Sequence, residues 1–163
     1  MQVLFIPKGD VPLYDTLFAS ETSREALRFY HPVQIPAGVQ ISMATMGGAL
    51  SLASDLRWYV RRYMHEVLFE LSEGVYCTRA LAKEIYYGRA AILHTSWRFR
   101  RAYTMKNGSL VSDDPLPAER GRSATTPGSR MEDGIVLEVW CTEEEFSGQK
   151  KSDEVDEEDV TSS

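Results

Sequence analysis

The stretch IVLEVWCTEEEF, residues 135–146, contains the boundary between the last predicted strand of the chain and an acidic tail. Its first half alternates between two sets of side chains, and one set consists of Ile135, Leu137, Val139 and Cys141. A period of two is typical of a β-strand that turns one face toward a core. Its second half is acidic. The stretch therefore predicts a strand over residues 135–140 and a departure from the sheet from Cys141 onward.

Negative charge is concentrated after residue 141. The chain of 163 residues has a net charge of −6, but residues 1–141 carry sixteen basic and fifteen acidic side chains. Residues 142–163 carry nine acidic side chains and two lysines. Almost no apolar residue follows Phe146, so burial cannot offset the entropy of ordering this part. We predict one β-rich domain over residues 1–141 and a disordered acidic tail over residues 142–163.

Further alternating segments precede this strand. Period-two patterns occur at residues 39–43, 67–71 and 97–105. The stretch MKNGSLV contains Asn107 and Gly108, a pair that tolerates the positive φ of a tight hairpin turn. Short strands with such punctuation favour a sandwich or a barrel. The fold class that we predict is therefore mainly β.

Residues 113–133, DDPLPAERGRSATTPGSRMED, are rich in Pro, Gly, Ser and Thr and lack hydrophobic periodicity. This composition predicts a long flexible loop. A strand that follows such a loop has to pair with earlier parts of the chain. We therefore expect the pairing of residues 135–140 to be non-local.

Residues 55–72 fit a second pattern as well. Their apolar side chains also follow one face of a helix, with Asp55 able to cap its start and Gly74 its end. Periodicity alone does not choose between helix and strand here. A helix near residues 55–72 makes the alternative fold class α+β.

Several function classes find no support in the composition. No apolar run approaches the ~18 residues of a membrane span, and the two cysteines, Cys77 and Cys141, fit a reducing compartment without disulfides. His31, His65 and His94 lack the spacing of metal ligands, so no metal or other cofactor is predicted. Arginines alternate with aromatic residues near positions 57–62 and 97–101, and such a pattern can bind single-stranded nucleic acid. The nearly neutral body makes nucleic acid an unfavoured partner.

Two longer stretches resemble the dUTPase family. They are LYDT…SREALRFYHPVQIPAGVQISMAT, residues 13–45, and IYYGRAAILHTSWRFRRAYTMKNGSLV, residues 85–111. Their order and spacing are similar to those of the family's motifs over roughly the middle two-thirds of the chain. The resemblance implies a jelly-roll or β-sandwich fold and a homotrimer.

The catalytic residues of that family do not carry over. Ala26 or its neighbour Glu25 stands where the family has a metal-linked Asp, and Lys83 stands where the family has the Asp that activates water. A lysine ammonium cannot accept that proton. The resemblance therefore implies a scaffold without its chemistry, as in the dUTPase-like early regulatory proteins of adenoviruses, and no catalytic residue is predicted.

The opening stretch also contains a candidate docking motif. Pocket proteins of the retinoblastoma type bind Leu-x-Cys-x-Glu peptides in extended form, and this chain has Val139-x-Cys141-x-Glu143 followed by more acids. Thr142 and Ser152 precede acidic residues and are predicted phosphorylation sites. The alternative is that the motif is the buried end of a core strand. The partner-binding residues that we predict are Val139, Trp140, Cys141, Glu143, Glu144 and Glu145.

These patterns favour a non-enzymatic viral early regulatory protein that binds host proteins, among them a retinoblastoma-type pocket protein. Its expected location is the nucleus or cytoplasm of the host cell. Two alternatives stay open, which are a dUTPase-type nucleotide hydrolase and an acidic-tailed chaperone of histones.

Overall fold

The computed structural model describes residues 1–88, 98–116, 130–131 and 134–148. The strands are β1 (Gln2–Pro7), β2 (Val33–Ile35), β3 (Gly38–Ser42), β4 (Met64–Ser72), β5 (Val75–Cys77), β6 (Arg100–Lys106), β7 (Ser109–Leu116), β8 (Arg130–Met131) and β9 (Gly134–Trp140). The helices are α1 (Leu13–Ala19), α2 (Glu21–Leu27), α3 (Met46–Asp55), α4 (Arg57–Tyr63), α5 (Arg79–Tyr86) and α6 (Glu143–Phe146).

All nine described strands belong to one mixed sheet. Their order is β2-β3-β1-β4-β5-β9-β6-β7, and β8 pairs with β9 beside this path. The pair β5–β9 is parallel, and the other described pairs are antiparallel. β9 is an interior strand, because β6 lies along one side of it and β5 and β8 lie along the other.

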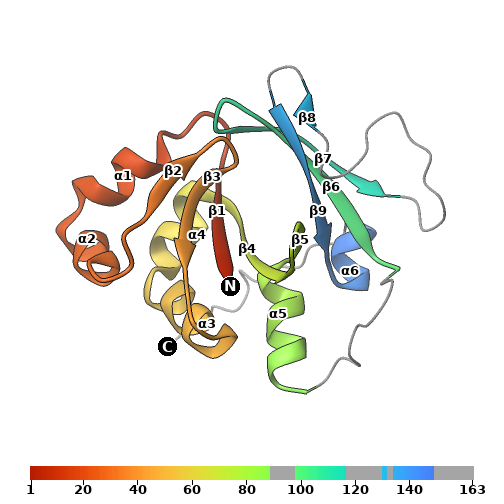
Figure 1. Cartoon of the computed structure of the whole chain (residues 1–163), viewed down its shortest axis with the longest axis horizontal. Coiled ribbons are helices and arrows are strands. Elements are labelled where there is room, and N and C mark those ends of the chain that lie inside the picture. Colours follow the sequence, from red (N-terminus) through yellow and green to blue (C-terminus); the bar gives the residue numbers. More distant parts are fainter. Residues whose placement is uncertain (89–97, 117–129, 132–133, 149–163) are drawn as a thin grey trace.

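The sheet has two halves that pack against each other. The first half consists of β2, β3, β1 and β4, and the second half consists of β9, β6 and β7. One face of β1 and β4 packs against the helices through Phe5 and Phe69. Their other face places Leu4 and Leu68 in a second cluster, together with Val139 and other side chains of β6 and β9. Figure 1 shows α1 to α4 on the side of the first half that faces away from β6, β7 and β9. The chain therefore forms a helical layer over two packed halves of one curved sheet.

The expectation of a β-rich domain is confirmed in its coarse form, as a mixed sheet with helices. The strand predicted over residues 135–140 is β9, and its partners β5 and β6 are distant in sequence, as expected. The predicted hairpin turn joins β6 and β7, and Asn107 and Gly108 both have positive φ.

Both interpretations of residues 55–72 are right for one half of that stretch. Residues 57–63 are α4, and β4 begins at Met64. In α4, Tyr59 and Tyr63 are four residues apart and contribute to the helix-side core. In β4, Val67 and Phe69 are two residues apart and contribute to the same core. The hydrophobic periodicity changes from that of a helix to that of a strand at residue 64, inside the stretch.

Residues 113–133 are not one continuous loop. Residues 113–116 extend β7, with Asp113 opposite Tyr103 of β6, and residues 130–131 form β8. The composition of this stretch did not reveal the pairing, which depends on a strand already set by the hairpin. The rest of the predicted loop, 117–129 and 132–133, lies outside the described residues.

The predicted tail is ordered at its start. Residues 143–146 form α6, which begins with a capping box between Thr142 and Glu145. The capping box satisfies backbone N–H groups at the start of α6, and it therefore orders a segment whose acidic composition predicted disorder. Residues 149–163 lie outside the described part of the chain.

Gly38 provides a test of the β1–β3 pairing. Its φ is +132°, and a Cβ at this position would collide with the carbonyl oxygen of Phe5. We expect Gly38→Ala to lower the free energy of unfolding by about 3 kcal/mol, because backbone strain and a steric clash add. Chemical denaturation measures this change.

Gly74 provides the matched control. Its φ is +82°, but nothing lies within 4 Å of a Cβ added there. Gly74→Ala should therefore cost only the backbone term, about 1 kcal/mol. Equal effects of the two substitutions would contradict the close approach at Gly38.

Candidate functional site at the C-terminal junction

The predicted docking motif lies at the end of β9. Val139 and Cys141 are fully buried, and Trp140 is nearly so. Val139 packs in the cluster between the two halves of the sheet, opposite Arg101 of β6 and Tyr76 of β5. A pocket protein would need this segment extended and accessible. In the folded chain the motif is therefore the buried end of a core strand.

Hydrogen bonding to the sheet continues one residue beyond β9. The backbone N–H of Cys141 donates to the carbonyl oxygen of Phe99 at 2.8 Å, and its Sγ lies 3.4 Å from the same oxygen. The indole Nε1–H of Trp140 donates to the Glu138 carboxylate at 2.8 Å. The expected departure from the sheet therefore begins at Thr142 and not at Cys141.

One carboxylate joins the beginnings of α5 and α6. Glu145 Oε1 accepts the backbone N–H of Thr142 at 3.1 Å and the hydroxyl of Thr78 at 2.6 Å. Thr78 and Thr142 are the N-caps of α5 and α6, and each hydroxyl also accepts a backbone N–H of its own helix. A negative charge beside two helix N-termini is favourable. Glu145 thus fixes α6 against α5.

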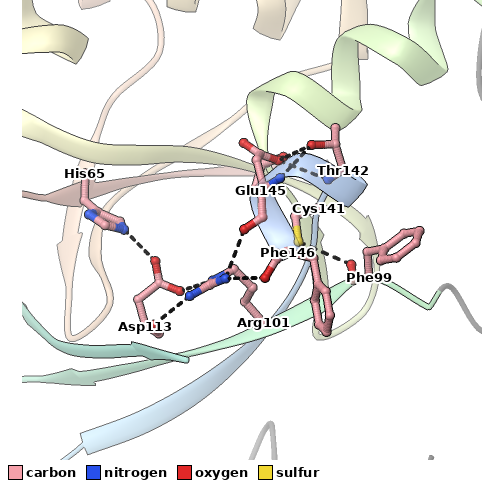
Figure 2. A network of polar contacts seen from close by, with 9 residues as sticks. His65, Phe99, Arg101, Asp113, Cys141, Thr142, Glu145 and Phe146 are labelled. Carbon is pink, nitrogen blue, oxygen red and sulfur yellow. Dashed lines mark hydrogen bonds and ion pairs between the residues drawn. The ribbon is translucent and has the colours of Figure 1, made fainter. Parts of the chain in front are cut away.

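Arg101 holds the other end of α6 (Figure 2). Its Nη1 donates to the carbonyl oxygens of Glu145 at 3.0 Å and Phe146 at 3.1 Å. Its Nε donates to the Asp113 carboxylate at 2.5 Å, and Nη2 donates to the carbonyl oxygen of Asp113 at 3.0 Å. A cation at the last carbonyls of a helix is favourable. Arg101 therefore connects edge strand β7 with α6.

His65 completes this network. Its Nε2 lies 2.8 Å from Oδ2 of Asp113, and its ring packs edge-on against Tyr103. Burial opposes ionisation of Asp113, but hydrogen bonds from His65 and Arg101 outweigh it and lower the pKa of this carboxyl. Asp113 is therefore an ionised group shared by an imidazole and a guanidinium.

A carboxylate-oriented imidazole is also the arrangement of a general base. Within the described ranges, no Ser, Cys or Lys side chain is hydrogen-bonded to His65. Burial, with Glu145 adding to it, raises the pKa of the Cys141 thiol to about 12. Burial also raises the pKa of Cys77 far above its ordinary value. Both side chains are thiols at neutral pH, and a thiol is a poor nucleophile.

The other predicted site residues lie in different environments. Glu143 and Glu144 are exposed on the first turn of α6, and Glu145 is half-buried. Thr142 is buried and caps α6, so a kinase could reach its hydroxyl only after α6 has detached from the rest of the domain. Ser152 lies outside the described residues.

The three positions compared with the catalytic residues of dUTPases lie on helices. Glu25 and Ala26 are on α2, where Glu25 pairs with Arg28 at 2.7 Å, and Lys83 is exposed on α5. The described part of the chain contains no group of three or more His, Cys, Asp or Glu side chains placed to hold a metal ion. His31 is exposed, and His94 lies outside the described residues.

Sequence reasoning missed Arg101, Asp113, His65 and Thr78. The pattern Thr142-x-x-Glu145 is a capping-box signature and could have predicted α6. No local pattern indicates the contact between His65 and Asp113, which are 48 residues apart.

Residues 1–104 match the family of unknown function DUF5804, and the chain belongs to that family. The matched region contains His65 and Arg101, whereas Asp113 and all of α6 lie beyond it. Neither a curated protein nor a solved structure matches the chain. Of the described helices, none has the length and apolar character needed to cross a membrane.

The lowered pKa of Asp113 makes the stability of the junction depend on pH. The ionised carboxylate stabilises the fold fully above its unfolded pKa of about 3.9, and this contribution is lost as pH falls through the lower folded pKa. Asp113→Asn should therefore reduce the free energy of unfolding at pH 7. The difference from wild type should stay constant down to about pH 5 and shrink below about pH 4.

Urea denaturation of both proteins between pH 3 and pH 7 measures this difference. Asp114→Asn is the control, because Asp114 is the exposed neighbour on β7. A pH-independent difference for Asp113→Asn would show that Asp113 contributes no charge-dependent stability.

Proposed function

We propose that the protein works by binding other proteins, and that the acidic residues after the junction form its binding arm. The observation that carries the proposal is the change at α6 from side chains held against the domain to exposed acidic side chains. Thr142 and Glu145 are held against the body, whereas Glu143 and Glu144 are exposed. Residues 149–163 then add six acidic side chains and two lysines. The arm begins at a fixed point of a nearly neutral body.

Charge indicates the class of partner. An exposed acidic arm attracts basic protein surfaces, and such attraction raises association rates more than it raises intrinsic affinity. Phosphorylation of Ser152 would add further negative charge next to Asp153 and Glu154. A regulatory protein with a basic surface and a histone both fit this description. The histone chaperone is therefore the alternative that the segregation of charge favours.

Binding to a retinoblastoma-type pocket is a narrower form of the proposal. It requires a locally open state in which Val139 and Cys141 leave the sheet. If opening costs about 3 kcal/mol, the apparent dissociation constant rises by roughly 150-fold. The exposed residue Glu143 remains available to such a partner without opening.

The dUTPase-like scaffold, the homotrimer and the setting of a viral early protein in the host cell stay predictions. What supports a sandwich-like or jelly-roll-like scaffold is the packing of Leu4 and Leu68 against Val139 across two halves of the sheet. The dUTPase-type hydrolase remains the enzymatic alternative. Turnover of dUTP with magnesium would favour that alternative over the binding function.

Neutralising the arm tests the proposal. Six amide substitutions at Asp153, Glu154 and residues 156–159 remove its clustered charge. Core histones serve as the basic probe in a titration at 0.1 M salt. We expect binding at least about tenfold weaker than wild type, since each exposed charge contributes a fraction of a kcal/mol.

The control variant exchanges Asp and Glu throughout residues 153–159 and so preserves charge. It should bind like wild type, and wild-type binding should weaken as salt increases. Unchanged binding by the neutral variant would refute the proposed arm.

Two substitutions in the docking motif distinguish its exposed position from its buried one. Glu143 is exposed, so Glu143→Ala should leave the thermal midpoint unchanged. Cys141 is fully buried, so Cys141→Ala should cost about 1 kcal/mol and lower the midpoint by about 3 °C. Differential scanning calorimetry measures both. Equal midpoints for wild type and Cys141→Ala would instead indicate that the motif end is loosely held.

A further inference from the structure

The helical layer contains a depression of 360 Å³, away from the C-terminal junction. This aromatic depression lies where α4 meets α1 and the link between α1 and α2. Its lining residues are Thr16, Ala19, Ser20, Trp58, Tyr59 and Tyr63.

Three aromatic rings shape the aromatic depression. Trp58 is 53% exposed, and its ring meets Tyr59 edge-on at 5.0 Å and Tyr63 at 5.9 Å. The hydroxyl groups of Tyr59 and Ser20 are hydrogen-bonded at 2.6 Å, which holds the Tyr59 ring in place. A large exposed indole beside fixed rings is an apolar surface suited to a small aliphatic side chain.

Positive charge lies beside these rings. Arg57 and Arg61 are exposed and four residues apart on α4, and the guanidinium of Arg62 lies 5.2 Å from the centroid of the Trp58 ring. In the described ranges, none of the three forms an ion pair with a carboxylate. Like charges at this spacing destabilise a helix by about 0.2–0.5 kcal/mol.

Neighbouring elements add charges of both signs. Lys8 contributes another exposed ammonium group, which donates to the carbonyl oxygen of Arg61 at 2.8 Å. The exposed acids on the neighbouring helices are Asp15 of α1, Glu21 and Glu25 of α2 and Asp55 of α3, and none of them pairs with an arginine of α4 in the described ranges. The surface around the rings therefore favours a ligand that is both anionic and partly apolar.

We propose that the aromatic depression binds residues 153–159, DEVDEED, of the same molecule. This segment has six acidic side chains and a single apolar one, Val155, with acids on both sides of it. Val155 is small enough for the depression, and the flanking acids complement the charge of Arg57, Arg61 and Arg62. The pairing would give these arginines the carboxylate partners that they lack among the described residues.

This inference rests on the proposed acidic arm and adds a regulation to it. An arm bound to its own body is not available to a basic partner, so the partner must compete with α4. If about two-thirds of the arms are bound in this way, the apparent affinity for the partner is lowered about threefold. The double variant Arg57→Gln, Arg61→Gln should therefore bind the partner about threefold more tightly than wild type.

A spin label on the arm tests the contact directly in the full chain. Ser162→Cys provides an attachment point, and Cys77 and Cys141 are buried and do not compete for the label. We expect the label to broaden the indole N–H signal of Trp58 much more than that of buried Trp140. Unbroadened Trp58 would overturn the proposal.

Three controls define the contact. Arg57→Gln with Arg61→Gln should abolish the broadening, as should six neutral amides in residues 153–159. Arg28→Gln removes one positive charge elsewhere on the helical layer and should leave the broadening intact. Broadening that survives neutralisation of the arm would overturn the role of charge.

A mixture of labelled and isotope-enriched unlabelled chains separates two geometries. Broadening only within one molecule supports the proposal, and broadening between molecules places the arm on a second copy and overturns it. The histone titration is independent of this result. Histone binding without broadening leaves the acidic arm in place and removes only its contact with α4.

Discussion

Arg101 is the side chain through which the sheet and the C-terminal helix hold each other. It donates to Asp113 on edge strand β7 and to the last carbonyl groups of α6, and it is only 16% exposed. Hydrogen bonds to charged groups contribute about 1.5–3 kcal/mol when they are sheltered from water. Without Arg101, the half-buried Asp113 would keep His65 as its single side-chain partner among the described residues, and α6 would lose the cation at its C-terminus. The beginning of the acidic arm depends on this contact.

The sequence predicts those parts of the fold that local periodicity determines. The alternation around Val139 identified β9, and Asn107 with Gly108 identified the turn between β6 and β7. The short helices α1 and α2 have only seven residues each, too few for a periodic pattern to distinguish them. The acidic composition predicted disorder from residue 142, but the pair Thr142 and Glu145 forms a local cap that outweighs it.

The candidate site was predictable only in part, because one pattern supported two interpretations. Val139 and Cys141 share a face with Ile135 and Leu137, and that shared face is the signature of a core strand. The same residues match a docking motif, and burial decides that the folded chain uses them as core. The contact of His65 with Asp113 depends on the curvature of the whole sheet. The exposed acids that follow the buried motif are therefore the part of this region that the folded chain presents to solvent.

The central claim is that the segment up to Cys141 belongs to the cooperative core and that the proposed binding arm starts beyond it. Native-state hydrogen exchange of the Cys141 amide, which donates to Phe99 O at 2.8 Å, tests this claim most directly. The account predicts that this amide exchanges only through global unfolding, with the same free energy as the core amides of β9. Exchange through a local opening several kcal/mol below global unfolding would contradict it and would make the docking motif accessible in the folded protein.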